Sequence, residues 1–200
     1  MSTKKVDPPQ FWIIAGPNGS GKSTLQQDVL FKDSERPFWI INPDLLAAQI
    51  QANEQSAEAN LQAVMRIESW LETSIRAYQS VGVETVLSTA KYQRLVNLAK
   101  SFGYHLNLIY VILDSPERCV ERVRLRIRKG GHQVPEEKIV ARYRRSLEQL
   151  PQFLEAADSA MIFDNSGKSP KLVAKKDTGI LTVDKDAPHC IVEVAKHIAG

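Results

Sequence analysis

Short apolar runs alternate with longer stretches in which apolar residues recur at helical spacing. The runs are nearly continuous in apolar residues, as in strands that are buried on both faces, and they span 11–15, 38–41, 83–87, 106–113 and 160–163. The longer stretches predict amphipathic helices over 22–30, 45–51, 57–79, 92–101 and 117–128. Strands and helices in alternation predict an α/β fold, a three-layer αβα sandwich around a mainly parallel sheet.

A hinged pair of helices is predicted after the fourth strand. The first begins with Ser115-Pro116-Glu117, which places a capping hydroxyl before a proline and an acid in the first turn. Val134-Pro135-Glu136 begins the second, and we expect Pro151 to end it. Between them, Lys129-Gly130-Gly131-His132 breaks the helical pattern. Residues 117–150 are therefore predicted to form a helical lid.

Length and composition predict one globular domain. The chain has 200 residues, of which 43% are hydrophobic and 24% charged, as in ordinary globular proteins. A turn at Asp177-Thr178-Gly179 predicts an edge hairpin, and a short closing helix completes the segment 170–200. No apolar run reaches the roughly 18 residues that cross a bilayer, and residues 1–10 lack a signal-peptide run, so we expect a cytoplasmic protein that binds no membrane. The net charge is only +3, so any basic site must be local.

The most specific motif follows the first predicted strand. Gly16-Pro17-Asn18-Gly19-Ser20-Gly21-Lys22-Ser23-Thr24 has the pattern GxxxxGK[ST] between a strand and a helix, which identifies a phosphate-binding P-loop. Its glycines let backbone N–H groups converge on phosphate oxygens, and the following helix adds its positive N-terminal end. We predict that this segment binds ATP, with Lys22 on the terminal phosphates and Ser23 on Mg²⁺. Motors, switches, transporters and kinases share the motif, so it does not name a reaction.

Two acids at the ends of later strands favour a kinase. Asp44 lies just beyond the second strand, at the edge where open parallel sheets bind ligands. It could accept the proton of an attacking substrate hydroxyl or help to orient Mg²⁺, and it could also cap the helix that begins at Leu45. Glu84 lies in the apolar third strand, where a charge needs a partner or a ligand unless the strand is a water-facing edge. With Thr85 and Ser88 at the same strand end, Glu84 is predicted to bind the substrate.

A third acid follows the fourth strand. The segment from Leu108 to Asp114 resembles a Walker B strand, which ends in an acid that holds the magnesium shell. Asp114 is followed at once by the Ser115-Pro116 cap, so it could instead serve only the turn. Asp114 is therefore a candidate metal ligand together with Ser23.

Basic residues concentrate in the predicted lid. Most are expected to lie on a solvated helix and to pair with acids, and the set comprises Arg118, Arg122, Arg124, Arg126, Arg128, Lys129, Arg142, Arg144 and Arg145. Phosphoryl transfer needs cations around the equatorial oxygens, and a hinged helix pair suits a lid that closes over the triphosphate. Arg122 and Arg126 are the catalytic candidates and Arg128 is a candidate for ATP binding. His132 lies beside them as a candidate substrate ligand.

Taken together, these motifs resemble the zeta toxin family of P-loop kinases, in its compact branch. The matching pieces are WIIAGPNGSGKST, INPD, VETVLS, SPERCVERVRLRIRKGGHQVPEEKI and FDNS, in order from Trp12 to about Ser166. The resemblance implies an ATP-dependent kinase that phosphorylates a hydroxyl of a UDP-sugar such as UDP-N-acetylglucosamine, and it makes an antitoxin protein a possible partner. It also implies Asp44 as the base, Glu84 as a substrate contact and Arg122 as a lid arginine on the phosphates.

The chain departs from the family pattern at two positions and in length. Val86 stands where family members often carry Thr, and His132 stands near the place of a second lid arginine in toxins of the larger branch. The chain also lacks room for the long sugar-binding insertions of those toxins. These departures bear on the acceptor rather than on the kinase reaction.

Other functions are consistent with the same motifs. The chain could be a kinase of another metabolite or of an antibiotic hydroxyl, or a regulatory P-loop ATPase that changes conformation without a phosphorylated product. A nucleic-acid partner is not expected, because the basic residues are confined to the lid and no aromatic stacking strip accompanies them.

Overall fold

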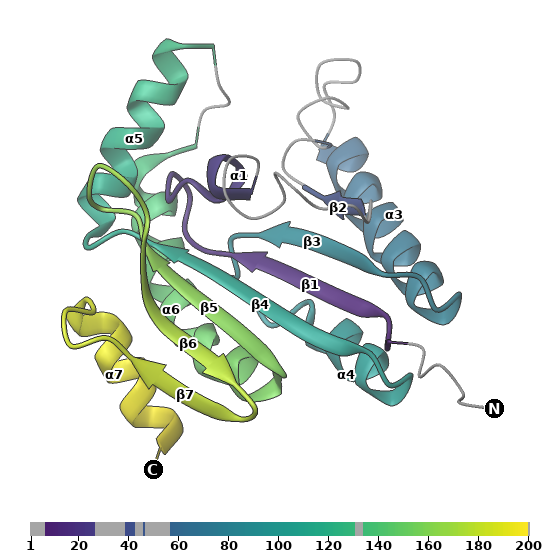
Figure 1. Ribbon diagram of the computed structural model, residues 1–200. Helices are drawn as coiled ribbons and strands as arrows, with labels where there is room; N and C mark the ends of the chain where they lie inside the picture. The colour runs from purple at the N-terminus through teal and green to yellow at the C-terminus, as the bar shows by residue number, and fades with distance from the viewer. Residues whose placement is uncertain (1–6, 27–38, 43–45, 47–56, 131–133, 200) are drawn as a thin grey trace.

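Seven strands form one sheet through the centre of the computed structural model, in the order β2-β3-β1-β4-β5-β6-β7 (Figure 1). Their bounds are β1 Gln10–Ala15, β2 Trp39–Ile41, β3 Val81–Thr85, β4 His105–Ile112, β5 Ser159–Asp164, β6 Lys171–Asp177 and β7 Ile180–Val183. The strands β2, β3, β1, β4 and β5 pair in parallel, and β6 and β7 add an antiparallel edge. The structure describes residues 7–26, 39–42, 46, 57–130 and 134–199. The predicted sheet and its C-terminal edge hairpin are confirmed.

The central strands are apolar because both of their faces are buried. β1 lies between β3 and β4, with Ile14 opposite Glu84 on one side and opposite Ile109 on the other. Ile14 and Ile109 are fully buried, and Glu84 is 8% exposed. Glu84 therefore lies inside the sheet, and the alternative of a water-facing edge is excluded.

Most of the described helices cover one face of the sheet. The helices are α1 Lys22–Leu25, α3 Ala57–Arg76, α4 Gln93–Ser101, α5 Pro116–Arg128, α6 Glu136–Ala156 and α7 His189–Ala199. Side chains from α3 to α7 join those of the central strands in the larger buried cluster. On the opposite face, Leu25 of α1 packs with Ile14 and Phe163 in a smaller cluster. Residues 27–30 of the first predicted helix, and nearly all of the predicted helix 45–51, lie outside the described residues.

The helix α6 continues through Pro151, so the prediction that this proline ends the helix is wrong. Pro151 cannot donate a backbone hydrogen bond, which costs roughly 3 kcal/mol inside a helix. The additional turn buries Phe153 and Leu154, which are 2% and 1% exposed. Burial of such side chains contributes about 1.5–3 kcal/mol each, so it offsets the loss at the proline.

The predicted lid contains two helices, α5 and α6, which are paired through Arg124 and Glu136 at 2.6 Å. The hydroxyl of Ser115 accepts a hydrogen bond from the N–H of Arg118 at 3.3 Å, which confirms the predicted cap of α5. α5 then extends beyond the carboxyl ends of the strands, at the upper left of Figure 1. α5 ends at Arg128 with Lys129 as its C-cap, and Gly130 follows with a φ of 85°. None of the described helices is long and apolar enough to cross a membrane.

Candidate active site

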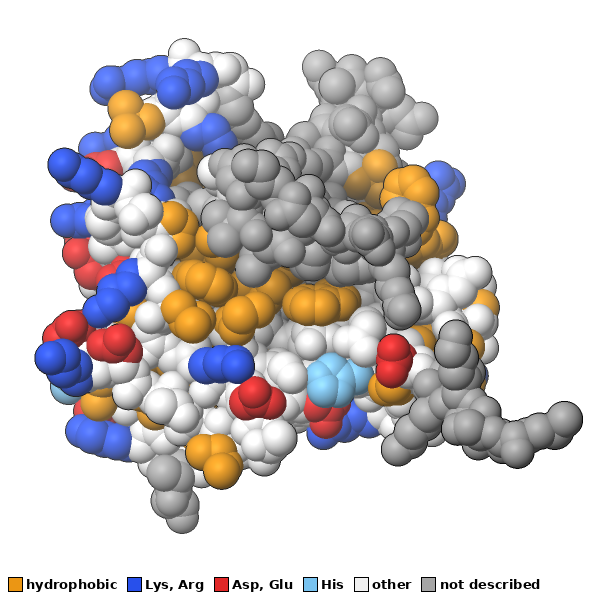
Figure 2. Space-filling model, in the orientation of Figure 1, with side chains coloured by type: hydrophobic (Ala, Val, Ile, Leu, Met, Phe, Trp, Pro, Cys, Tyr) orange, Lys and Arg blue, Asp and Glu red, His pale blue; other side chains and the backbone are white. Residues whose placement is uncertain are grey.

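The carboxyl ends of neighbouring parallel strands meet at one edge of the sheet. β1 continues into the P-loop at Gly16, β3 into 86–88, β4 into Leu113-Asp114 and β5 into Asn165-Ser166. Open α/β sheets bind ligands in the crevice outside such ends. α5 lies over the same edge, and Figure 2 shows its Lys and Arg side chains gathered at the upper left.

The P-loop wraps around the side chain of its own lysine. The ammonium of Lys22 donates to the carbonyls of Gly16 and Pro17 at 2.8 and 3.1 Å, and the residue is 8% exposed. The N–H of Ser20 donates to the carbonyl of Pro17 at 3.2 Å and closes the turn. The first two residues of the segment predicted to bind ATP, 16–24, are thus held at the ammonium of Lys22.

Close neighbours leave no room for a side chain at Gly19 or at Gly21 of the loop. A Cβ on Gly19 would lie 2.8 Å from the carbonyl oxygen of Cys119 in α5, and a Cβ on Gly21 would lie 2.4 Å from the amide nitrogen of Asn165. Both glycines also have positive φ angles, of 79° and 94°, which strain other residues. Burial raises the pKa of the Cys119 thiol to about 12, so the thiol stays neutral in the buried core. The P-loop is therefore packed against both α5 and the segment after β5.

Ser23 and Glu84 form a direct polar contact at the end of the P-loop. The hydroxyl of Ser23 donates to the carboxylate of Glu84, with 3.0 Å to each of the two oxygens. Ser23 is exposed, whereas Glu84 is buried. The two residues meet because β3 pairs directly with β1, which leads into the loop. Glu84 is predicted from the sequence to contact the substrate. It also lies beside the hydroxyl of Ser23, which is predicted to bind magnesium.

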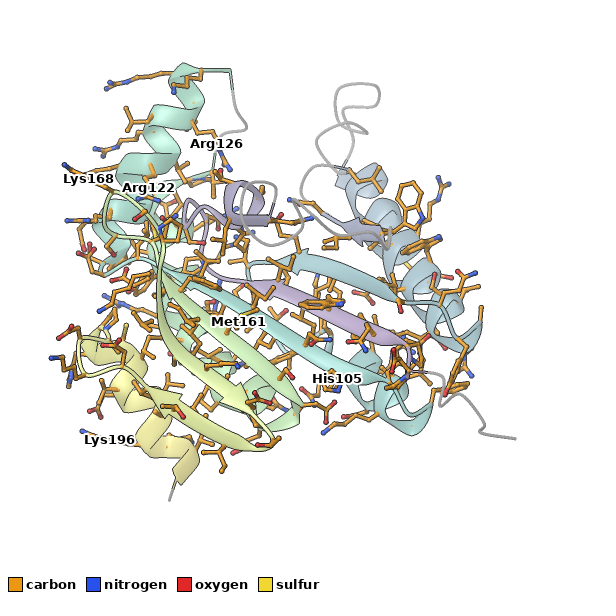
Figure 3. The ribbon with its side chains drawn as sticks, in the orientation of Figure 1. His105, Arg122, Arg126, Met161, Lys168 and Lys196 are labelled. Carbon is orange, nitrogen blue, oxygen red and sulfur yellow. The ribbon has the colours of Figure 1, made fainter. Side chains whose placement is uncertain are left out.

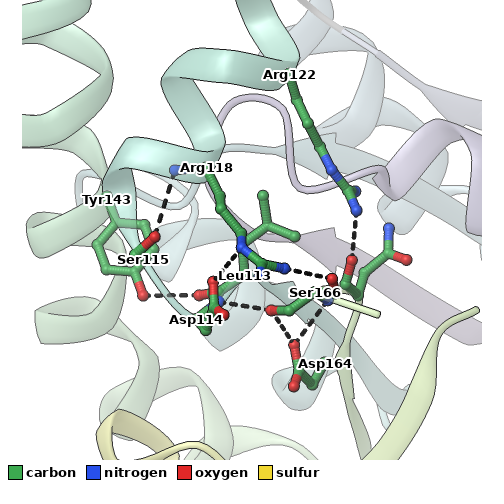
Figure 4. A network of polar contacts seen from close by, with 9 residues as sticks. Leu113, Asp114, Ser115, Arg118, Arg122, Tyr143, Asp164 and Ser166 are labelled. Atoms are coloured by element: carbon green, nitrogen blue, oxygen red, sulfur yellow. Dashed lines mark hydrogen bonds and ion pairs between the residues drawn. The ribbon is translucent and has the colours of Figure 1, made fainter. Parts of the chain in front are cut away.

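Asp114 belongs to a different set of contacts (Figure 4). Its carboxylate pairs with Nε of Arg118 at 3.2 Å, and its N–H donates to the hydroxyl of Ser166 at 2.7 Å. That hydroxyl donates to the carboxylate of Asp164, and Arg118 also donates to the carbonyl of Ser166. No contact joins Asp114 to Ser23 in the described part of the chain, so a metal role for Asp114 stays a prediction.

Arg122 lies against the P-loop. Its Nη2 donates to the carbonyl of Asn165 at 2.6 Å, and its Nη1 is 3.7 Å from the Cβ position of Gly21. Figure 3 shows Arg122 and Arg126 on the side of α5 that faces the loop, one helical turn apart. Arg128 is exposed at the end of α5, and its predicted contact with ATP stays a prediction.

A second arginine reaches the P-loop from α6. Arg142 donates to the side-chain oxygen of Asn18 at 3.4 Å, a contact that sequence reasoning missed because it grouped Arg142 with the solvated lid. α6 is held in place beneath this arginine, since the hydroxyl of Tyr143 donates to the carbonyl of Leu113 at 2.8 Å. Burial raises the pKa of Tyr143, so its hydroxyl keeps its proton and remains a donor. The hydroxyl of Ser146 likewise donates to the loop after β3 at 2.8 Å.

The other residues predicted to bind substrate fall into two groups. Thr85 and Ser88 lie at the end of β3, where the hydroxyl of Thr85 accepts from the N–H of Leu87 at 3.1 Å and shapes the turn. Ser88 is partly exposed in the same turn. Asp44 and His132 lie outside the described residues, so their roles stay predictions.

Comparison with known proteins gives a family and a relative. The model of a family described as an AAA domain matches residues 11–150. A protein of Haemophilus influenzae that is itself uncharacterised is 28% identical over 132 residues, which cover 66% of this chain and 90% of that protein. The family match contains the P-loop, the Glu84 strand and both lid helices up to residue 150.

Solved structures share the fold over nearly the whole chain. A chain of the AvrRxo1-ORF1:-ORF2 complex with ATP matches 97% of this chain, at a TM-score of 0.68 and 18% identity, and this chain spans 64% of its length. A chain of the PezAT toxin–antitoxin system of Streptococcus pneumoniae matches 96% of this chain and 87% of its own length, at a TM-score of 0.61 and 16% identity. The chain therefore shares its fold with chains of these two complexes, and the predicted resemblance to the zeta toxin family is confirmed at the level of the fold.

Proposed function

The chain belongs to the AAA domain family, and from this premise we propose that it is an ATP-dependent kinase that phosphorylates a hydroxyl of a small molecule. The observation that carries the proposal is the contact of 3.0 Å between Ser23 and the carboxylate of Glu84. It places an acid from the neighbouring strand beside the hydroxyl that holds magnesium in P-loop enzymes. Arg122, at 2.6 Å from the carbonyl of Asn165, adds a cation next to Gly21 of the same loop.

Ser23 and Glu84 fit a magnesium ion. Mg²⁺ prefers oxygen ligands, keeps several waters and is usually bound through one or two protein groups together with substrate phosphates. A hydroxyl and a carboxylate in contact supply such oxygens, and no larger group of potential ligands is found among the described residues. A magnesium ion held by these two residues would supply positive charge to the bound triphosphate. Glu84 serves the metal in this proposal, and Asp114 stays paired with Arg118.

The chain's own groups account for the rest of the transfer. The N–H groups of the P-loop and the ammonium of Lys22 hold the β- and γ-phosphates, and Arg122 faces the equatorial oxygens. The acceptor oxygen attacks the γ-phosphorus while the bond from that phosphorus to the β-γ bridging oxygen breaks, and ADP leaves. Asp44, which follows β2 in the sequence, takes the proton of the acceptor hydroxyl.

The proposed acceptor is a nucleotide sugar such as UDP-N-acetylglucosamine. Its support is the ordered set of motifs that resemble the zeta toxin family, together with the likeness to a chain of the PezAT system. Thr85 and Ser88, at the end of β3, are the described residues available for its hydroxyl groups. An antitoxin is the corresponding protein partner, because PezAT is a toxin–antitoxin system and AvrRxo1 was crystallised as an ORF1:-ORF2 complex.

Release of ADP from Mg·ATP across a panel of acceptors tests the proposal. The panel contains UDP-sugars, free sugars and hydroxyl-bearing antibiotics, and Lys22→Ala with an unchanged circular dichroism spectrum is the inactive control. We expect ADP release that depends on one class of acceptor and is lost in Lys22→Ala. Release that no acceptor stimulates would favour a regulatory ATPase, and an absence of turnover with every acceptor would contradict the kinase.

A further inference from the structure

Asn165 connects three parts of the site. Its backbone N–H donates to the carbonyl of Ile112 in β4 at 2.9 Å. Its side-chain amide donates to the carbonyl of Ser20 in the P-loop at 2.7 Å. Its own carbonyl accepts from Arg122 of the lid helix at 2.6 Å. Asn165, which directly follows β5, therefore contacts the sheet, the phosphate loop and the lid helix α5.

We propose that Asn165 is a positioning residue for nucleotide binding, which orients the peptide between Ser20 and Gly21 and holds Arg122 over the loop. The inference rests on the proposed function, since it assigns a further residue to the nucleotide site of that kinase. Nothing in the P-loop motif itself specifies such a residue, because the contact joins positions that are 145 residues apart.

The hydrogen bond from Asn165 to the carbonyl of Ser20 orients the N–H of Gly21. In a trans peptide the C=O and the N–H point in opposite directions, so a carbonyl of Ser20 held toward Asn165 turns the N–H of Gly21 away from Asn165. The P-loop binds phosphate through such N–H groups, which must converge on one point. A donor on the carbonyl also polarises the peptide and strengthens its N–H as a donor.

The fit between Asn165 and Gly21 keeps this orientation. The amide nitrogen of Asn165 occupies the place of a side chain at position 21, because a Cβ there would lie 2.4 Å away from it. Ser20, the preceding residue, is fully buried. The amide of Asn165 thus packs on two consecutive loop residues, which restricts rotation of the peptide between them.

The carbonyl of Asn165 also determines how Arg122 is presented. A carbonyl is a neutral acceptor, so it orients the guanidinium without neutralising its charge. Among the described residues no acid pairs with Arg122, whereas Arg118, one turn earlier in α5, pairs with Asp114 at 3.2 Å. An anion bound at Gly21 can therefore engage Arg122 without first breaking an ion pair.

Titration with a fluorescent, non-hydrolysable ATP analogue in the presence of Mg²⁺ tests the inference on the full chain. We expect Asn165→Ala to weaken analogue binding about tenfold, the scale of one lost buried hydrogen bond. Asn165→Asp has the same shape but sets a carboxylate against the carbonyl of Ser20 and the phosphates, so we expect a loss of about a hundredfold. The control is Ser166→Ala, because the hydroxyl of Ser166 contacts Asp114 and Asp164 rather than the P-loop, and we expect a change of less than about twofold.

Asn165→Asp also provides a measurement that a merely structural role would not affect. An aspartic acid ionises with a pKa near 3.9, which the anionic nucleotide raises, and its protonated form regains a donor and loses its charge. The affinity of Asn165→Asp relative to wild type should therefore recover as the pH falls from 8 to 5.5. If Asn165→Ala does not fold, the pH dependence of Asn165→Asp still tests the inference.

Three results would overturn the inference. They are equal affinities of the wild type and Asn165→Ala, a loss in Ser166→Ala as large as that in Asn165→Ala, and an affinity of Asn165→Asp that does not recover at low pH. A wild-type protein that does not bind the analogue would instead contradict the proposed function. The two failures are thereby distinguished in one set of titrations.

Discussion

The hydroxyl of Ser23 lies 3.0 Å from both carboxylate oxygens of Glu84, although 61 residues separate them in the chain. Ser23 follows β1 and Glu84 is near the end of β3, and these two strands are direct neighbours in the sheet. The acid beside the P-loop hydroxyl therefore comes from β3 rather than from β4, which leads to Asp114. This relationship makes Glu84 the first residue to test for magnesium.

We predict that Glu84→Gln raises the Mg²⁺ concentration needed for half-maximal ATP turnover by roughly 10- to 100-fold, the scale seen when groups that support a metal are altered. The amide keeps the size of the side chain and removes its charge, so the packing of β3 is retained. Mg²⁺ titrations at fixed ATP measure the shift, and the thermal midpoint shows whether the fold is intact.

Asp114→Asn is the matched control for this titration. Asp114 pairs with Arg118 in an exposed ion pair, which contributes about 1 kcal/mol or less to stability. We expect its magnesium requirement to equal that of the wild type. If the magnesium requirement rises in Asp114→Asn and not in Glu84→Gln, Asp114 rather than Glu84 is the metal ligand.

Asp44→Asn should reduce phosphoryl transfer by roughly 10² or more while ATP affinity changes by only a few-fold, because a general base acts on the proton of the acceptor. Single-turnover transfer to the acceptor found in the ADP-release panel measures the first quantity, and analogue titration measures the second. Transfer at nearly the wild-type rate would leave Asp44 as a helix cap only.

Glu84 also shows what could be predicted from the sequence. A charge inside an apolar strand indicated that this residue needs a partner, and the P-loop motif singled out Ser23. Their contact could not be predicted, because it depends on β3 pairing next to β1 instead of following chain order. For Asp114 the sequence predicts either a metal role, because an acid ends an apolar strand, or a role in the turn alone. Its pairing with Arg118 four residues later agrees with the second interpretation and leaves the metal role a prediction.

The missed contacts share one cause. Asn165 stands after a strand and before Ser166-Gly167, where a polar residue is typical of a turn, and its contact with Ser20 is set by the tertiary structure. Arg142 reaches Asn18 from a helix that carries other arginines, and nothing local distinguishes it from them. Hydrophobic periodicity predicts elements and their order, whereas such side-chain contacts depend on how the elements pack.

Arg122→Ala should lower kcat by roughly 10²-fold and ATP affinity by much less, because charge spreads onto the transferring oxygens chiefly in the transition state. We expect the same direction for Arg126→Ala, since Arg126 lies one turn further along the same face. Arg124→Ala is the control, because Arg124 pairs with Glu136 at 2.6 Å and its side chain is 57% exposed. If kcat falls as much in Arg124→Ala as in Arg122→Ala, the loss comes from a general disturbance of α5 and not from removal of the Arg122 charge.

The last prediction concerns movement of α5 against α6. The two helices are joined by the pair of Arg124 and Glu136, whose side chains are 57% and 52% exposed, so that water and salt weaken this contact. Several arginines on one helix also repel one another until a polyanion neutralises them. We therefore expect amide exchange in residues 117–150 to slow when a non-hydrolysable ATP analogue binds.

Exchange in Arg122→Ala and in Gly130→Ala separates the causes of this protection. Arg122→Ala removes the cation of α5 that lies beside Gly21 and should lose most of the protection at saturating analogue. Gly130→Ala adds a Cβ that meets no atom within 4 Å, but its φ of 85° strains a residue with a side chain, so it should alter the hinge without touching the nucleotide site. If the wild type exchanges equally fast with and without the analogue, α5 and α6 form a static pair, and the arginines of α5 act from fixed positions rather than by closing.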